Sequence, residues 1–465
     1  MIDNGLPEGW ELVVGLEVHV ELATKTKLFS GSPNRFGDEP NTNIDPVTLG
    51  LPGALPVLNE HAVELAMRIG LALNCTVKPS TFHRKNYFYP DLSKAYQITQ
   101  YDEPLNVDGF LMLPGGVRIG VERAHMEEDT GKSTHFGGAG GRIHGSDYSL
   151  IDFNRAGVPL VEIVSHPDVR TAEQARQYVN ELRAILVAVG ASDAKMEEGS
   201  MRCDANVSVR KYGAELGTRC EIKNVNSVRS LGKAIEYEAR RQIDVLETGG
   251  TIRQETRHWD ETDGRTHTLR AKVDANDYRY FLEPDLVMLA PDAEWVERVR
   301  AALPVLPAAR RTNLAVLTGA DEDSEAIAVV VERGQDTYIQ EVKNAGGDAG
   351  RALVWVQQSF AEEGNAPRLP AKDLAALTVL ERDGKLTATQ AKTVLGDMLD
   401  RSISLVESGE KVVVEDMGME QNRNGDWLIT RVHIMRRGTG LRRKGATSTV
   451  LWEEITGFAV AEHNQ

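Results

Sequence analysis

The chain has few of the residues that mark several whole classes of protein. It contains 3 cysteines in 465 residues, and no two of them have CxxC spacing. This excludes a disulfide scaffold and a four-cysteine zinc site, so we expect Cys75, Cys203 and Cys220 to be reduced, buried thiols. The longest apolar runs, such as 184–189 and 326–331, are far shorter than the ~20 residues that span a membrane.

Basic residues are also in deficit. Lys+Arg number 53 against 69 for Asp+Glu, a formal net charge of −16. Nonspecific nucleic-acid binding needs a basic surface, so this balance argues against it, while an excess of carboxylates suits a protein that holds divalent metal ions. The first residues have neither the basic nor the apolar region of a signal peptide. We therefore expect a soluble, cytoplasmic protein with no membrane partner.

Residues 1–294 are predicted to form an α+β domain. Apolar periodicity predicts helices at 59–73, 171–187 and 227–248. Several short alternating segments lie between the helices, rather than one strand for each helix. This arrangement favours a mostly antiparallel sheet over a doubly wound parallel fold.

The composition changes twice after this domain. Residues 295–395 are dominated by Ala, Leu, Val, Glu and Arg, which predicts a helical domain. Residues 396–465 predict a small β-rich module. Its expected strands are 411–414, 427–432 and 450–452.

The segment 15–22, GLEVHVEL, alternates between apolar and polar residues. In a strand, Glu17, His19 and Glu21 would share one face because successive side chains point to opposite faces. Two carboxylates and an imidazole on one face form a plausible site for a hard metal ion. A solvated polar face of a half-exposed strand explains the same pattern, and both interpretations stay open.

Two further segments alternate in the same way. Residues 201–210 place Arg202 and Asp204 on one face, and 219–223 places Glu221 and Lys223 on one face. Carboxylates that bind magnesium, next to Arg and Lys that neutralise phosphate, are typical of a metal–nucleotide site. The alternative is a salt-bridged open face of an antiparallel sheet.

The residues Gly131-Lys132-Ser133 resemble the end of a Walker A loop, but Met126 stands where that motif needs its first glycine. What remains is three adjacent acidic residues followed by a lysine and two hydroxyl side chains. These residues could bind a metal ion next to a phosphate, or they could simply form a charged turn.

Residues 82–97 interleave aromatic side chains with basic and amide groups, including Lys85 and Asn86. Such a segment can stack a base and bind phosphates, or line the core.

No nucleophile stands out. The chain has no GxSxG elbow and no HExxH metal motif. The residues by themselves therefore favour magnesium-dependent phosphoryl-transfer or ligase chemistry on a sheet face over acyl-enzyme hydrolysis.

Five segments together resemble one family. They are 15–22, 84–91, 125–133, 195–206 and 277–281, in this order along the chain. The chain is similar to the GatB family, the B subunits of glutamyl/aspartyl-tRNA amidotransferases. The likeness is close over residues 10–295 and looser to about 395.

The resemblance implies a cradle domain with a glutamine-synthetase-like sheet. It implies that ATP phosphorylates the side-chain carboxylate of Glu-tRNA(Gln) or Asp-tRNA(Asn), and that ammonia then displaces the phosphate to give Gln-tRNA(Gln) or Asn-tRNA(Asn). An A subunit would make the ammonia from glutamine, and a C subunit would hold A and B together. The implied class is a carbon–nitrogen ligase with glutamine as amido donor, and ATP and Mg²⁺ are the implied cofactors.

Residue roles follow from the matching positions. The expected metal ligands are Glu17, His19, Glu128, Glu162 and Asp204, with Glu21 and Glu221 as weaker members. Among these, Glu17, His19, Glu128 and Asp204 are expected to be catalytic. The expected ATP and phosphoryl contacts are Lys85, Asn86, Lys132, Ser133, Arg202 and Lys223. Glu162 lies within the apolar segment 159–164, where a carboxylate needs a partner.

The end of the chain departs from the family pattern. The helical YqeY-like tail, which helps the family bind tRNA, has no counterpart here, and residues 396–465 look instead like a PRC-barrel-type β module. Its basic cluster could contact RNA or anionic lipid, or be a solvated turn. The cluster consists of Arg436, Arg437, Arg442, Arg443 and Lys444. Two other functions stay open: a tRNA-independent ligase of glutamine-synthetase type, and a noncatalytic scaffold with an altered tail.

Overall fold

The computed structural model describes residues 5–137, 145–271, 278–361 and 367–401, and the backbone of three strands beyond them. The chain separates into two compact units, Met1–Leu306 and Pro307–Gln465. Each unit has a hydrophobic core of its own.

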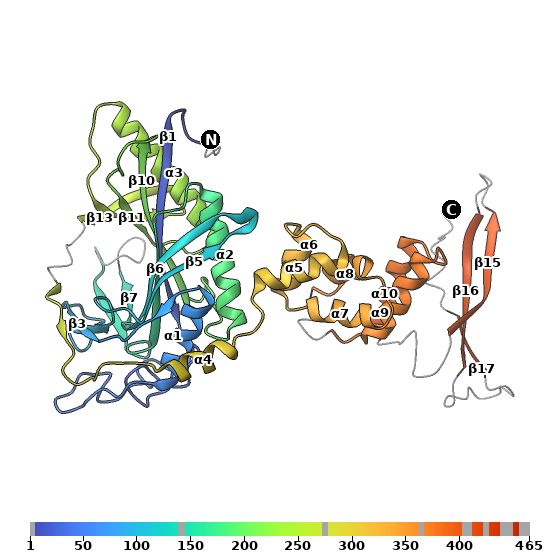
Figure 1. The fold of residues 1–465 in the computed structure, drawn as a ribbon, viewed down its shortest axis with the longest axis horizontal. Helices are drawn as coiled ribbons and strands as arrows, with labels where there is room; N and C mark the ends of the chain where they lie inside the picture. The colour runs from blue at the N-terminus through green and yellow to red at the C-terminus, as the bar shows by residue number, and fades with distance from the viewer. Residues whose placement is uncertain are drawn as a thin grey trace. The chain divides into compact units, whose positions relative to one another are not determined.

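The first unit is built on a 12-stranded sheet (Figure 1). Its main path runs β13-β12-β11-β10-β1-β9-β6-β4-β3-β14, and β5 links β2 to β6. The strands are β1 Trp10–Glu21, β2 Thr76–Val77, β3 His83–Asn86, β4 Tyr96–Thr99, β5 Asn106–Met112, β6 Arg118–Glu128, β9 Pro159–Ser165, β10 Met201–Lys211, β11 Cys220–Lys223, β12 Glu255–Asp260, β13 Arg265–Ala271 and β14 Phe281–Leu282. All their pairings are antiparallel except β11 with β12. The predicted mixed fold with a mostly antiparallel sheet is confirmed, while its likeness to glutamine synthetase stays a prediction.

Three helices, all predicted from the sequence, pack against one face of the sheet (Figure 1). They are α1 Glu60–Ala72, α2 Ala172–Ala188 and α3 Val228–Glu247. Each begins after a residue whose side chain accepts hydrogen bonds from the first turn: Asn59, Thr171 and Ser227 respectively. This satisfies backbone N–H groups that have no partner within the helix.

One face of the sheet makes the core with these helices. Leu16, Val18 and Val20 of β1 have no exposed surface and pack in the same cluster as the buried residues of α1, α2 and α3. The alternation predicted for 15–22 is thus confirmed, and Glu17, His19 and Glu21 lie on the other face. The three cysteines are buried free thiols, as expected.

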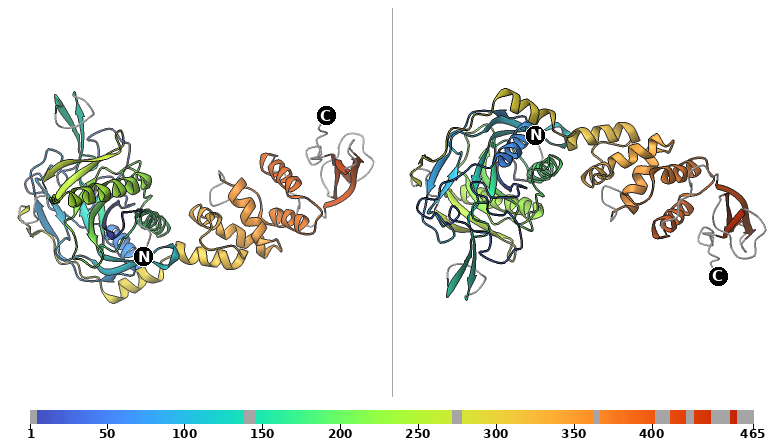
Figure 2. Two further views of the ribbon diagram at one scale, coloured as in Figure 1. Left: turned by 90° about the horizontal axis from the view of Figure 1, so that it is seen from above. Right: turned by 90° about the horizontal axis from the view of Figure 1, so that it is seen from below.

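Two smaller elements complete the first unit. The strands β7 Lys132–Phe136 and β8 Tyr148–Asp152 form a separate two-stranded sheet that projects from the unit (Figure 2). The helix α4 Ala293–Ala301 packs against α1 and buries Val299 in the core. The sequence predicts that the first domain ends at residue 294, which lies at the start of α4. The first compact unit instead continues to Leu306. The division into three domains stays a prediction.

The second unit begins with helices. These are α5 Pro307–Thr318, α6 Glu325–Glu332, α7 Asp336–Asn344, α8 Ala349–Ser359, α9 Ala371–Arg382 and α10 Ala388–Arg401. After them, β15 Val412–Gln421, β16 Trp427–Arg437 and β17 Val450–Glu454 pair antiparallel in that order. Strands were expected in each of these three segments. The basic cluster at 436–444 lies outside the residues whose side chains are described. Among the described residues, no helix has the length and apolar character needed to cross a membrane.

Candidate active site

The uncovered face of the sheet carries a polar cavity of about 380 Å³. Its wall comes from β1, β3, β4, β6, β9, β11 and β12 and from the segments before β5, β11, β12 and β14. The lining residues are Glu17, His19, Lys85, Thr99, Tyr101, Arg123, His125, Glu127, Glu162, Arg219, Glu221, Lys223, Gln254, Thr256, Tyr278 and Tyr280. The cavity therefore combines carboxylates, imidazoles and cationic side chains.

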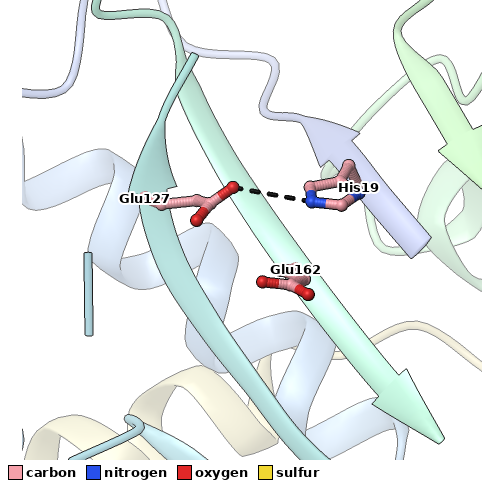
Figure 3. Close-up of side chains that lie close together, drawn as sticks. All are labelled: His19, Glu127 and Glu162. Atoms are coloured by element: carbon pink, nitrogen blue, oxygen red, sulfur yellow. Dashed lines mark ion pairs between the residues drawn. The ribbon is translucent and has the colours of Figure 1, made fainter. Parts of the chain in front are cut away.

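Three side chains from three neighbouring strands converge in this cavity (Figure 3). His19 of β1 lies opposite Glu162 of β9, and Glu127 comes from β6 on the other side of β9. One ligand atom each from His19, Glu127 and Glu162 lies within 4.8 Å of the others. The His19 Nε2 to Glu127 Oε1 distance is 3.6 Å. We call these three residues the His19 cluster.

His125 supports this cluster through Glu162. It is fully buried and lies opposite Glu162 in the β6–β9 register. Its Nε2 is 3.2 Å from Glu162 Oε2. Burial alone would raise the pKa of Glu162, but the close contact with His125 and the charges of His125 and His19 outweigh burial and hold that pKa well below its usual range.

A second group of charges adjoins the cluster across β1. Glu17 lies opposite Asp204 of β10 and accepts a 2.7 Å hydrogen bond from Asn206 Nδ2. Lys223 Nζ bridges Asp204 Oδ2 at 2.5 Å and Glu221 Oε1 at 3.2 Å. The structure therefore brings together four of the predicted metal-site carboxylates, Glu17, Glu162, Asp204 and Glu221, on one face.

This concentration of negative charge changes the pKa values of its members. Burial, followed by the charges of Glu162 and Glu221, raises the pKa of Glu17. Burial alone would lower the pKa of Lys223, yet the charges of Asp204 and Glu221 outweigh it and raise that pKa. Carboxylates that repel one another favour a bound cation, since it neutralises them.

The residues present therefore fit a divalent metal ion. Glu127 and Glu162 offer oxygen ligands of the kind that magnesium prefers, and His19 adds a nitrogen ligand. Lys85 and Arg219 lie on the same wall and carry positive charge, which is the kind of charge that pairs with phosphate oxygens.

Glu128 is not part of the cluster, although the sequence points to it. Its carboxylate receives hydrogen bonds from Lys94 Nζ at 2.5 and 2.6 Å and from the backbone N–H of Ile98 at 3.0 Å. Consecutive residues of a strand face opposite sides of the sheet. Hence Glu127, the neighbour that sequence analysis missed, occupies the place expected for Glu128.

Glu21 and Arg202 form a polar group beside the cavity. Arg202 lies opposite His19 and donates a 2.6 Å hydrogen bond from Nη2 to Asp129 Oδ2. Burial, together with the nearby Asp129 charge, raises the pKa of Glu21 to about 7. Neither Glu21 nor Arg202 lines the cavity itself.

The other expected ATP contacts are divided between two places. Lys85 and Lys223 line the cavity, and Asn86 at the end of β3 donates a 2.8 Å hydrogen bond to the carbonyl of Arg279. Lys132 and Ser133 lie on β7 in the separate two-stranded sheet. The structure does not bring Lys132 or Ser133 to the cavity.

Sequence analysis also missed several cavity residues. Arg123, His125 and Glu127 occupy alternate positions of β6, so the period of two seen in β1 was the signal that could have found them. Tyr101 and Tyr280 stack with ring centroids 5.4 Å apart, and the Arg123 guanidinium is 4.9 Å from the Tyr101 ring centre. Tyr101 and Tyr280 are far apart in sequence, so no local pattern predicts their contact.

Comparison with known proteins identifies the family. A family model described as the GatB/GatE catalytic domain matches residues 12–297, which include every residue of the cavity. The chain belongs to the GatB/GatE family. The resemblance inferred from the five sequence segments is thereby confirmed.

Curated relatives match most of the chain. It is 49% identical to the B subunit of the aspartyl/glutamyl-tRNA(Asn/Gln) amidotransferase of Corynebacterium diphtheriae, over 89% of this chain and 86% of that one. It is 50% identical to the protein of the same name from Nocardia farcinica, over 88% of this chain and 84% of that one. The corresponding protein of Rhodococcus jostii is 51% identical, over 84% of this chain and 81% of that one.

The C-terminal module matches a different family model from the one expected. Residues 392–461 match the actinomycetes SH3 domain, so the PRC-barrel resemblance was wrong. Short strands joined by polar turns are common to many small β folds, and this pattern predicts strands without distinguishing between those folds.

Proposed function

We propose that this chain is the B-type subunit of a tRNA-dependent amidotransferase and carries the ATP-dependent step. The observation that supports this most directly is the convergence of His19, Glu127 and Glu162 in a cavity that Lys85 and Lys223 also line. Membership of the GatB/GatE family, and about half-identical relatives that are named as B subunits, support the same function.

The proposed reaction activates a carboxylate. The side-chain oxygen of Glu-tRNA(Gln) or Asp-tRNA(Asn) forms a bond to the γ-phosphorus of ATP, and ADP leaves with the electron pair of the broken P–O bond. Ammonia then attacks the carbonyl carbon of the acyl phosphate. The C–O bond to phosphate breaks, inorganic phosphate leaves with the electron pair, and the nitrogen loses a proton to become the amide of Gln-tRNA(Gln) or Asn-tRNA(Asn).

Each step needs charge neutralisation more than covalent help from the protein. Glu127, Glu162 and His19 would hold Mg²⁺, with Glu17 beside them. When bound, the metal ion would supply Lewis-acid stabilisation of the phosphate oxygens. Lys85, Arg219 and Lys223 would orient the phosphate chain, and the Tyr101–Tyr280 pair offers an aromatic surface for a base.

The partners follow from the reaction. Ammonia is mostly protonated at neutral pH and is then not a nucleophile, so an A subunit that releases it from glutamine, and a C subunit that joins A and B, are part of the proposal. The naming of the relatives as B subunits is consistent with such an assembly. The misacylated tRNA supplies the carboxylate. The actinomycetes SH3 domain stands where the family's tRNA-binding tail was expected.

The test is a reconstitution. The chain is combined with A and C subunits, ATP, Mg²⁺, glutamine and Glu-tRNA(Gln), and Gln-tRNA(Gln) is quantified. Product in the wild-type assembly, and its loss in a Glu127→Gln assembly, is the expected result.

The two alternatives predict different outcomes. A tRNA-independent ligase would hydrolyse ATP with free glutamate and ammonia at the same rate when tRNA is omitted. A noncatalytic scaffold would give no product, while a complete B subunit from a relative works in a parallel assembly. Either outcome would overturn the proposal.

A further inference from the structure

A second group of metal-binding side chains lies at the edge of the sheet, on the hairpin formed by β12 and β13. His258 of β12 is directly opposite His267 of β13 in the register. Their imidazole rings stack with centroids 5.4 Å apart and 30° between planes. The pair places a second imidazole beside that of His267 across the hairpin.

Two carboxylates come from the same hairpin, Asp260 at the end of β12 and Asp263 in the turn that follows. Asp263 Oδ2 is 2.8 Å from His267 Nε2, and one ligand atom each from Asp260, Asp263 and His267 lies within 4.8 Å of the others. The Oδ1 atom of Asp260 accepts a 2.9 Å hydrogen bond from the Thr262 N–H, and the Oδ1 atom of Asp263 accepts one of 2.9 Å from the Arg265 N–H. These bonds fix both carboxylates relative to the strand that carries His267.

We propose that the β12–β13 hairpin binds one transition-metal dication, and Zn²⁺ is the ion with which the proposal can be tested. His267, Asp263 and Asp260 form the core of the site, and His258 is the fourth ligand. Two imidazoles and two carboxylates match the four-coordinate preference of zinc. Nitrogen ligands also select zinc, nickel or copper over magnesium, which favours oxygen.

This site is separate from the His19 cluster. The hairpin ligands are absent from the wall of the 380 Å³ cavity, and the two sites differ in ligand type. The His19 cluster offers two carboxylates and one imidazole from three different strands, whereas the hairpin offers its ligands from one continuous segment, 258–267. The inference therefore does not depend on the proposed amidotransferase function.

The local nature of the site makes it testable without partner subunits. Zn²⁺ is titrated calorimetrically into the full chain in excess Mg²⁺, in a His19→Asn background so that the cavity does not contribute. One equivalent of Zn²⁺ is expected to bind. His267→Asn added to this background is expected to weaken binding by about tenfold or more, because it removes a direct ligand.

A matched control comes from another exposed histidine that has a carboxylate partner. His61 Nδ1 of α1 is 3.6 Å from Glu64 Oε2, without further ligands grouped around it among the described residues. His61→Asn is expected to leave the Zn²⁺ isotherm unchanged. An unchanged isotherm for His267→Asn, or loss of binding in His61→Asn alone, would overturn the proposal, as would the absence of any Zn²⁺ binding.

A second variant and a folding control separate loss of binding from misfolding. Asp263→Asn keeps the size of the side chain and removes only its charge. Thermal melts followed by circular dichroism establish that each variant is folded. Side-chain NMR of ¹⁵N-histidine-labelled protein then locates the ligands. Zn²⁺ should shift the His258 and His267 ring signals and leave that of His61 in place, and the opposite pattern would refute the assignment.

Discussion

Glu127 and Glu128 are adjacent in sequence, and their side chains lie on opposite faces of the same sheet. Glu127 faces His19 at 3.6 Å in the polar cavity, while Glu128 is held by Lys94 at 2.5 Å behind it. Both side chains are nearly inaccessible to solvent. Under the proposed function Glu127 takes part in the chemistry of the cavity, while Glu128 holds the buried Lys94, and each residue makes its own prediction.

Glu127→Gln should reduce amidation strongly without unfolding the chain. The variant removes one oxygen ligand from the His19 cluster and with it part of the charge that stabilises the transferring phosphoryl group, so a loss of at least about 100-fold in kcat is expected. Its urea midpoint in metal-free buffer should stay equal or rise, since one of several mutually repelling carboxylates is gone. Full activity in the reconstituted assembly would show that Glu127 is not a ligand.

Glu128→Gln should instead destabilise the fold. The side chains of Lys94 and Glu128 are 7% and 4% exposed. Removing one member of a buried ion pair leaves the other charge without compensation, at a cost of about 3 kcal/mol. Urea unfolding of the first unit, compared with that of Glu127→Gln, measures the difference, and equal midpoints for the two variants would contradict it.

Magnesium should raise the thermal stability of the wild-type chain alone, before any partner is added. A ligand that binds only the native state stabilises it in proportion to the logarithm of its concentration. Each kcal/mol gained raises Tm by about 2–4 °C for a unit of this size. A Glu162→Gln variant should lose this response, and an undiminished response there would place the ion elsewhere.

Lys27 should give the chain a distinctive alkaline pH dependence. Its side chain is 1% exposed and donates hydrogen bonds to the carbonyls of Asn43 at 2.6 Å and Phe153 at 3.3 Å. Burial lowers the pKa of Lys27 to about 8, against attraction from Asp45 and Glu128. Above that pKa the native state binds fewer protons than the unfolded state, so this residue adds stability as pH rises toward the unfolded value of about 10.4.

The measurement compares wild type with Lys27→Met between pH 7.5 and 9.5. The wild-type free energy of unfolding should rise by about 1–2 kcal/mol relative to the variant over this interval. Only the difference between the two slopes is interpreted, because other groups titrate equally in both proteins. Parallel slopes would mean that Lys27 keeps its ordinary pKa in the folded state.

Lys223 and Lys132, both expected from the sequence to contact ATP, should behave differently. Lys223 lines the cavity and bridges Asp204 and Glu221, whereas Lys132 lies on the separate β7–β8 sheet. Lys223→Met should raise KM for ATP by about tenfold or more, the effect of losing one charge-assisted phosphate contact. Lys132→Met should change the KM for ATP less than twofold in the same assay. A larger effect of Lys132→Met than of Lys223→Met would show that Lys132 contacts ATP.

Local patterns predicted the elements whose signals are local. The three capped helices of the first unit and the face-by-face alternation of β1 follow from neighbouring residues alone, because capping and pleating act over a few positions. Asp204 and Lys223 lie on strands with a clear period of two, which places them on the polar face, whereas Glu162 was found as the one carboxylate of an apolar strand. The predicted reaction came from the family resemblance, which rests on the five segments and their order along the chain.

The structure places several expected site residues away from the cavity. The choice of Glu128 passed over the period of two in β6, which places Glu127 on the same face as Arg123 and His125. Lys132 and Ser133 are expected as phosphate contacts from their place in the segments that resemble the family, but their strand pairs with β8 in a separate sheet. The stacked tyrosines at 101 and 280 could not be linked from sequence, because nothing in either segment specifies the other.

The single parallel pair in the large sheet makes one edge of the sheet depend on a helix. The strands β11 and β12 run in the same direction, and α3 is the connection between them. Parallel strands cannot be joined by a tight turn, so the β12–β13 hairpin reaches its place beside β11 only through the excursion of the chain that contains α3. The edge that carries the two stacked histidines is therefore anchored through a helix and not through a local turn.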